Sequence, residues 1–154
     1  MSSALVGSQT SSPIGVEAPS SPPSCMIVED QALIGLALEA YLEDLGFAVS
    51  EPLSSVAAAL RWLETNTPTV AVLDYTLQDG PCTKLVRALA QRGIPVVIYS
   101  GHKSSVAPPE LRSVPWINKP CDREVLLAAL LRAAPALASW QGSRESCGLS
   151  PRPR

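Results

Sequence analysis

Three acidic side chains come directly after short apolar runs of the chain. Glu29 and Asp30 follow the run CMIV, and Asp74 ends the run VAVLD. Both runs are apolar along their whole length, so each predicts a strand that is buried on both faces. A carboxylate at the end of such a strand is costly unless another group meets it. We therefore expect other charged or polar groups of the chain to lie near these acids.

Two further polar side chains end later apolar runs. Ser100 ends the run PVVIYS, and Lys119 follows the run VPWIN. Neighbouring carboxylates raise one another's pKa, so three of them in one place call for a balancing cation. Oxygen ligands without His or Cys nearby favour Mg²⁺. We expect a magnesium site, with Lys119 either completing the charge balance or holding an anion.

These side chains require a fold that gathers the ends of distant strands. Short apolar runs alternate with segments of helical periodicity, which are typical of a parallel sheet covered by helices on both faces. Five runs fit a flavodoxin-like doubly wound α/β sheet with strand order 2-1-3-4-5, in which ligands bind beyond the carboxyl ends of the strands. The predicted strands are 25–28, 47–50, 70–74, 95–100 and 114–118, and the predicted helices are 31–45, 56–63, 83–92 and 123–134.

The composition limits the classes of protein that remain. The 154 residues are 46% hydrophobic, which is enough for one domain with a core. A formal net charge of −2 gives no general reason to expect nucleic acid or a membrane surface as a partner. There is no apolar run of transmembrane length and no signal peptide pattern, and the four cysteines form no C-x-x-C pair. We expect a reduced, cytoplasmic protein.

Both ends of the chain differ from its middle. Residues 1–23 are mostly Ser, Pro, Gly and other small types with a single charged residue, Glu17. Residues 136–154 place arginines among Gly, Ser and Pro. Such segments bury too little apolar surface to offset the entropy of ordering, so both are predicted to be disordered tails. The predicted folded domain is residues 24–135.

In chain order, Glu29-Asp30, Asp74, Ser100 and Lys119-Pro120 resemble the receiver domain of bacterial two-component response regulators. The resemblance covers essentially all of residues 24–135. It implies that Asp74 accepts a phosphoryl group from a sensor histidine kinase. It also implies that Asp30 binds Mg²⁺ directly and that Glu29 does so through water.

The same resemblance assigns further roles. Thr76, two residues after the acceptor, would bind Mg²⁺ through its backbone carbonyl. Lys119 would pair with the phosphoryl oxygens, and its peptide bond to Pro120 would be cis. Ser100 would donate a hydrogen bond to the phosphoryl group. Trp116 stands three residues before Lys119, where receivers usually carry an aromatic switch residue.

The segment PVVIYSGH, residues 95–102, is similar to the receiver subfamily named for a Pro-Phe-x-Phe-Ala-Thr-Gly-Tyr motif. Pro95, Ser100 and Gly101 are kept in type, while the aromatic positions differ. Members of that subfamily typically stand alone and work with histidine kinases of the HWE or a related class. Adjacent prolines at 108 and 109 interrupt the region where receivers carry their fourth helix. We expect that helix to be shortened or disordered, with at most one turn.

Three functions remain open at this point. The first is a stand-alone receiver that acts by contact with an unknown downstream protein or as a phosphate sink, because nothing after residue 135 predicts an output domain. It would be an enzyme only in catalysing its own phosphorylation and dephosphorylation. The second is a pseudo-receiver that binds a partner without phosphorylation. The third is a hydrolase or nucleotide-binding enzyme, which the lack of a Gly-rich phosphate loop and of a G-x-S-x-G elbow disfavours.

Overall fold

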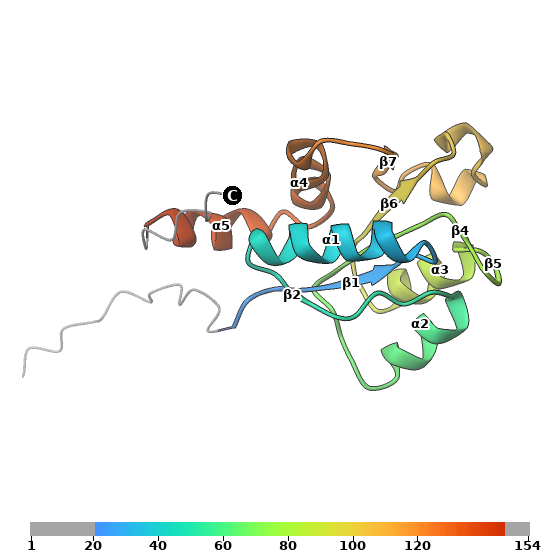
Figure 1. The fold of residues 1–154 in the computed structure, drawn as a ribbon, viewed down its shortest axis with the longest axis horizontal. Helices are drawn as coiled ribbons and strands as arrows, with labels where there is room; N and C mark the ends of the chain where they lie inside the picture. The colour runs from blue at the N-terminus through green and yellow to red at the C-terminus, as the bar shows by residue number, and fades with distance from the viewer. Residues whose placement is uncertain (1–20, 147–154) are drawn as a thin grey trace, which may run out of the picture.

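The computed structural model describes residues 21–146, which fold around a five-stranded sheet (Figure 1). All pairings in this sheet are parallel, and its order is β2-β1-β3-β6-β7. This order is the predicted 2-1-3-4-5 arrangement once a small separate hairpin is set aside, so the predicted fold class is confirmed. The strands are β1 (Ser24–Val28), β2 (Ala48–Val49), β3 (Val70–Leu73), β6 (Val96–Ser100) and β7 (Trp116–Asn118).

Two helices cover each face of the sheet. Helices α1 (Ala32–Asp44) and α4 (Arg123–Ala133) lie on one face, and α2 (Val56–Leu63) and α3 (Thr83–Gln91) lie on the other (Figure 1). All four residues of β3 are buried, as the continuous apolar run predicted. The buried side chains accordingly form two clusters, one on each side of the sheet. No helix within residues 21–146 is long and apolar enough to cross a membrane.

Local sequence signals fix the ends of several helices. The Ser55 side chain accepts a hydrogen bond from the Ala58 amide at the start of α2, at 3.0 Å. Glycines follow two helices at positive φ: Gly46 after α1 at 93° and Gly93 after α3 at 69°. A residue with a Cβ atom is strained in this region, so glycine suits both positions.

A two-stranded antiparallel hairpin, which the sequence did not predict, follows β3. Its strands are β4 (Thr76–Leu77) and β5 (Gly80–Pro81). Asp79 at its turn accepts hydrogen bonds from the amides of Val56 and Ala57, at 2.9 and 3.0 Å. The hairpin therefore caps the first turn of α2 with a carboxylate from another part of the chain.

The region of the expected fourth helix is short, as predicted, but it contains two turns instead of at most one. These are the 3-10 turns η1 (Ser104–Val106) and η2 (Pro109–Leu111). Leu111 is buried to 1% exposure and anchors η2 in the core. Glu110 forms a two-armed ion pair with Arg87 of α3. Pro109 occupies the first position of η2, where a missing amide proton is tolerated, so the prolines shorten the helix without removing all helical structure.

The prediction of a disordered tail from residue 136 is wrong for helix α5 (Leu137–Ser146). Leu137 and Trp140 are buried, and the Trp140 ring lies 5.5 Å from the ring of Phe47. Two apolar side chains three residues apart are enough to attach this helix to the domain, although the surrounding composition is polar. Residues 1–20 and 147–154, for which disorder was also predicted, lie outside the described residues.

Candidate functional site

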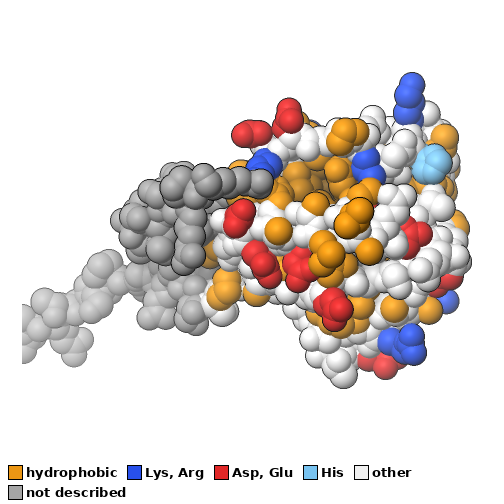
Figure 2. Space-filling model, in the orientation of Figure 1, with side chains coloured by type: hydrophobic (Ala, Val, Ile, Leu, Met, Phe, Trp, Pro, Cys, Tyr) orange, Lys and Arg blue, Asp and Glu red, His pale blue; other side chains and the backbone are white. Residues whose placement is uncertain are grey.

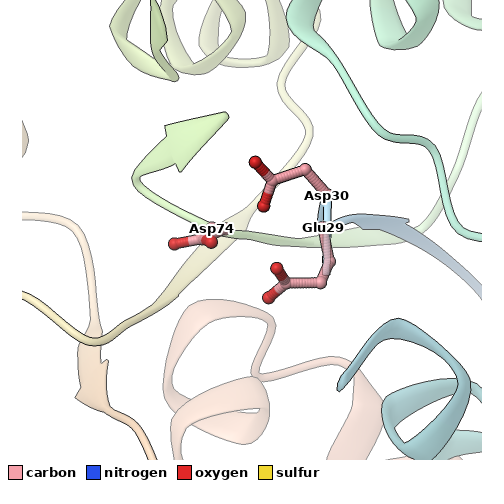
Figure 3. Close-up of side chains that lie close together, drawn as sticks. All are labelled: Glu29, Asp30 and Asp74. Atoms are coloured by element: carbon pink, nitrogen blue, oxygen red, sulfur yellow. The ribbon is translucent and has the colours of Figure 1, made fainter. Parts of the chain in front are cut away.

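The carboxyl ends of β1 and β3 bring three acids together, as the strand pattern predicted. The two strands are neighbours, and Val28 pairs with Leu73 at their ends. Glu29 and Asp30 follow one strand and Asp74 follows the other, so all three leave the sheet at the same edge. One carboxylate oxygen from each residue lies within 4.8 Å of the others. Figure 3 shows these side chains grouped beyond the two strand ends.

Lys119 follows β7, the edge strand two places from β3, and its side chain reaches the same cluster. Its Nζ atom donates a hydrogen bond to Glu29 Oε2 and lies 3.1 Å from Asp74 Oδ2. The Lys119 backbone amide donates to the carbonyl of Ser100, at 2.8 Å, which holds the residue at the end of β7. The peptide bond between Lys119 and Pro120 is cis, as the resemblance implied. As predicted, Lys119 therefore lies against the acids at the strand ends.

Burial shapes the electrostatics of this cluster. Glu29 is 3% exposed and Asp74 is 7% exposed. Burial raises the pKa of Glu29, although the Lys119 ammonium and the Gln31 amide act against this rise. For Lys119, burial acts to lower the pKa, but its hydrogen bonds to Glu29 and Asp74 outweigh that effect and raise it. Lys119 is therefore a firmly charged ammonium.

The donor set of this cluster fits a small divalent cation. All ligand atoms that the three acids offer are carboxylate oxygens, which Mg²⁺ prefers over nitrogen or sulfur. One ammonium cannot neutralise three carboxylates, so the cluster retains an excess of negative charge. Glu29 already accepts hydrogen bonds at both oxygens, from Lys119 and from the Gln31 amide at 3.0 Å. Asp30 is half-buried at the rim of the cluster.

Ser100 and Trp116, the predicted switch residues, both form hydrogen bonds with the backbone of His102. Ser100 is fully buried, and its Oγ atom accepts a hydrogen bond from the His102 amide, at 3.1 Å. The indole Nε1 of Trp116 donates to the carbonyl of the same residue, at 2.8 Å. The Trp116 ring also lies 5.2 Å from the ring of Tyr75, which follows Asp74 directly. The sequence did not reveal this bridging role of His102.

Thr76 begins β4, two residues after Asp74, and its side chain is exposed. The role implied for it uses the backbone carbonyl, so side-chain exposure does not bear on that role.

One residue near the site, Tyr99, was not singled out by the sequence. The ring of Tyr99 lies beside Lys119, with 5.5 Å between Nζ and the ring centroid. An aromatic residue directly before Ser100 is the sequence signal that could have pointed to it.

The chain is similar to proteins of one family. The profile described as the response regulator receiver domain matches residues 25–131. The acid tolerance regulatory protein ActR of Rhizobium meliloti (strain 1021) is 31% identical over 114 residues, which are 71% of this chain and 58% of ActR. The chain therefore spans less than two thirds of that relative's length.

Solved structures give the same picture. The solution structure of SdrG from Sphingomonas melonis Fr1 is 34% identical, with a TM-score of 0.63, and the match covers 71% of this chain and 97% of SdrG. A second SdrG structure, from Pseudomonas melonis Fr1, is described as a BeF3-activated conformation. It is also 34% identical, with a TM-score of 0.63, and the match covers 73% of this chain and 98% of that one.

Proposed function

Because this chain belongs to the response regulator receiver domain family, we propose that it accepts a phosphoryl group on Asp74 from a sensor histidine kinase. The contact between the Lys119 ammonium and the Asp74 carboxylate carries this proposal. It places a fixed positive charge beside the acid that would react, inside a cluster of further acids. The matched residues 25–131 include every residue of this cluster.

In the proposed transfer, a carboxylate oxygen of Asp74 attacks the phosphorus atom of a phosphohistidine. The oxygen–phosphorus bond forms as the phosphorus–nitrogen bond breaks, and the electron pair of that bond returns to the imidazole of the kinase. Negative charge is spread over the oxygens of the transferring group. The Lys119 ammonium, 3.1 Å from Asp74 Oδ2, supplies positive charge beside those oxygens.

Glu29, Asp30 and Asp74 would hold Mg²⁺ in this proposal, with the Thr76 carbonyl as a further oxygen ligand. When bound, Mg²⁺ supplies positive charge that offsets the charge of the phosphoryl oxygens. The two hydrogen bonds that Glu29 already accepts favour a contact through water for this residue. Asp30 and Asp74 are then the direct carboxylate ligands.

The product, an aspartyl phosphate, carries about two negative charges beside the end of β6, in place of the single charge of the Asp74 carboxylate. The buried hydroxyl of Ser100 is the donor that we propose meets this charge. Its Oγ atom now accepts a hydrogen bond from the His102 amide, so recruitment of Ser100 would alter the loop at residues 100–102. Trp116 would respond because it is bonded to the same loop.

The proposed partners are proteins. The phosphoryl donor is a sensor histidine kinase, and the resemblance of residues 95–102 favours the HWE class. The output is contact with an unknown downstream protein, or the chain acts as a phosphate sink. We propose a cytoplasmic location, in keeping with the free thiols of Cys25, Cys82 and Cys121.

Acetyl phosphate, a small phosphoryl donor, tests the acceptor role without a kinase. With Mg²⁺ present, we expect the intact mass of the chain to rise by one phosphoryl group. Asp74→Asn should abolish this change, whereas Asp44→Asn, at an exposed acid of α1, should leave it intact. A chain that stays unmodified would be the pseudo-receiver. Phosphorylation that persists in Asp74→Asn would point to another acceptor.

Phosphotransfer profiling tests the partner. Purified, autophosphorylated histidine kinases of the source organism are mixed with the chain for short times, and loss of label from each kinase is followed. One kinase, or a small group of the HWE class, should transfer label much faster than the rest. Equal and slow transfer from all of them would contradict a dedicated kinase partner.

A further inference from the structure

Tyr99 shares a face of the sheet with Lys119. Tyr99 directly precedes Ser100 on β6. Because consecutive strand residues point to opposite faces, the side chains of Tyr99 and Ser100 lie on opposite faces of the sheet. In the pairing of β6 with β7, Tyr99 lies opposite Ile117, two residues before Lys119. This register accounts for the 5.5 Å between the Lys119 Nζ atom and the centroid of the Tyr99 ring.

The Tyr99 side chain also lies beside Cys121, with which it lines the same cavity. Tyr99 is half-buried, and burial raises the pKa of its phenol. The Tyr99 side chain interacts with Cys121, which follows Lys119 by two residues. The aromatic side chain therefore contacts the loop after β7 at two points, the ammonium of Lys119 and the residue two positions further on.

The contact between Tyr99 and Lys119 can restrict the position of the Lys119 ammonium. Lysine carries its charge on a flexible four-carbon stem, so its position is set by what surrounds it. Glu29 and Asp74 attract the ammonium from one side through hydrogen bonds. The face of an aromatic ring attracts a cation and excludes water, which limits the other positions that the ammonium can take.

We propose that Tyr99 is a positioning residue that keeps the Lys119 ammonium in contact with the acidic cluster. The proposal rests on the proposed phosphoryl transfer to Asp74, because the gain from a fixed ammonium appears in that step. Tyr99 does not touch the reacting atoms and acts only through Lys119. Loss of the ring should therefore slow the phosphorylation of Asp74 without abolishing it.

The competing role for Tyr99, called a wall role below, is only to line a cavity without affecting Lys119. Its ring lines a largely apolar cavity of about 520 Å³ between α1 and α4, which Figure 2 shows as a hollow. Tyr41 provides a matched control, because its ring lines the same cavity and also lies near a cation. That cation is the Arg123 guanidinium, 4.9 Å from the ring centroid. A wall role predicts similar effects of replacing Tyr41 and Tyr99, and a positioning role does not.

The first measurement needs no phosphoryl donor. Carbon-13 chemical shifts and relaxation of the Lys119 ε-methylene are recorded in the full chain and in Tyr99→Phe, Tyr99→Leu, Tyr99→Met and Tyr41→Leu. The ring current of Tyr99 should displace the shift in the wild type. Tyr99→Phe should keep this displacement and Tyr41→Leu should leave it unchanged. Tyr99→Leu and Tyr99→Met should lose it and make the lysine side chain more mobile.

The second measurement is the rate of phosphorylation by acetyl phosphate with Mg²⁺. Tyr99→Leu and Tyr99→Met should be slower by about 3- to 10-fold, from the usual strength of a partly buried cation–π contact, while Tyr99→Phe and Tyr41→Leu stay near the wild type. Two apolar replacements guard against one that fails to fold. Equal behaviour of Tyr99→Leu and Tyr41→Leu in both measurements would overturn the proposal. A wild type that is not phosphorylated would instead contradict the proposed function, and the Lys119 signals would still test the positioning.

Discussion

Ser100 and Trp116 are joined through the backbone of a single residue, His102. The His102 amide donates to Ser100 Oγ at 3.1 Å, and the His102 carbonyl accepts from Trp116 Nε1 at 2.8 Å. We therefore propose that a change in the hydrogen bonding of the buried Ser100 hydroxyl reaches the indole through His102. In this proposal Trp116 responds to the site through its hydrogen bond to the His102 carbonyl.

The first prediction follows from this link. When Asp74 is phosphorylated, or when beryllium fluoride takes the place of the phosphoryl group, the indole N–H resonance of Trp116 should shift. Ser100 would turn toward the new charge, and the bond from His102 would be altered. Nitrogen-15 NMR resolves one indole signal per tryptophan, so Trp62 and Trp140 serve as internal references. An unchanged Trp116 signal in fully phosphorylated protein would contradict the proposed coupling.

The second prediction concerns Lys119→Met. Removing the ammonium leaves Glu29 and Asp74 without their shared partner, and breaking a buried ion pair in this way costs about 3 kcal/mol. Added Mg²⁺ should recover more of the melting temperature in Lys119→Met than in the wild type, because the variant has more uncompensated negative charge. Lys84→Met removes an exposed lysine from α3 and should respond to Mg²⁺ like the wild type. Equal Mg²⁺ shifts in all three proteins would contradict an effect of Lys119 on the ion, and no shift in any of them would mean that the acids do not bind it.

The sheet and its acidic edge could be predicted because their signals are local and strong. Fully apolar runs such as 70–73 indicated buried strands, and the rule for parallel sheets then placed Asp30, Asp74 and Lys119 at one edge. The helices predicted at 31–45 and 83–92 end within one residue of the observed α1 and α3, just before Gly46 and Gly93. Each of these inferences needed only residue types and their spacing.

The parts that were missed depend on contacts between distant segments. The capping of α2 by Asp79 joins residues more than twenty positions apart, and nothing local in either segment indicates it. Helix α5 is attached by the contact of Trp140 with Phe47, which overrides the polar composition around it. The bridge through His102 uses backbone groups, which any residue type provides.

The third prediction tests the shortened region between β6 and β7. Leu111→Ala should lower the free energy of unfolding by about 2–4 kcal/mol, because this fully buried side chain leaves a cavity when truncated. Val106→Ala, in the neighbouring turn and 57% exposed, should change it by less than about 0.5 kcal/mol. Urea unfolding followed by circular dichroism measures both. Similar small effects would show that η2 is not anchored in the core.

The fourth prediction is a pH dependence that arises from Asp79. Hydrogen bonds from the amides of Ala57 and Val56 lower its pKa from the ordinary value of 3.8. A carboxyl with a lowered pKa in the folded state adds stability above its unfolded pKa, and this stability is lost as the pH falls through the folded pKa. Asp79→Ala should therefore be less stable than the wild type at neutral pH, and the difference should shrink in acid.

The control for this pH dependence is Asp122→Ala. Asp122 also precedes a helix, α4, but its side chain makes no capping hydrogen bond. Urea midpoints of the wild type and both variants are compared from neutral pH to below pH 3.8. We expect the pH to change the difference for Asp79→Ala more than that for Asp122→Ala, because only Asp79 accepts capping hydrogen bonds. A difference for Asp79→Ala that changes no more than that for Asp122→Ala would rule out the carboxylate cap as its source.

The last prediction concerns helix α5, which packs near the amino ends of the strands. Trp140→Ala should lower the free energy of unfolding by about 2–4 kcal/mol, since the ring is only 9% exposed and lies against Phe47. Ala138→Ser, at an exposed position of the same helix, should have little effect. Phosphorylation of Asp74 by acetyl phosphate should proceed normally in both, because the acids lie at the opposite, carboxyl edge of the sheet. A loss of phosphorylation in folded Trp140→Ala would instead couple this helix to the acidic cluster.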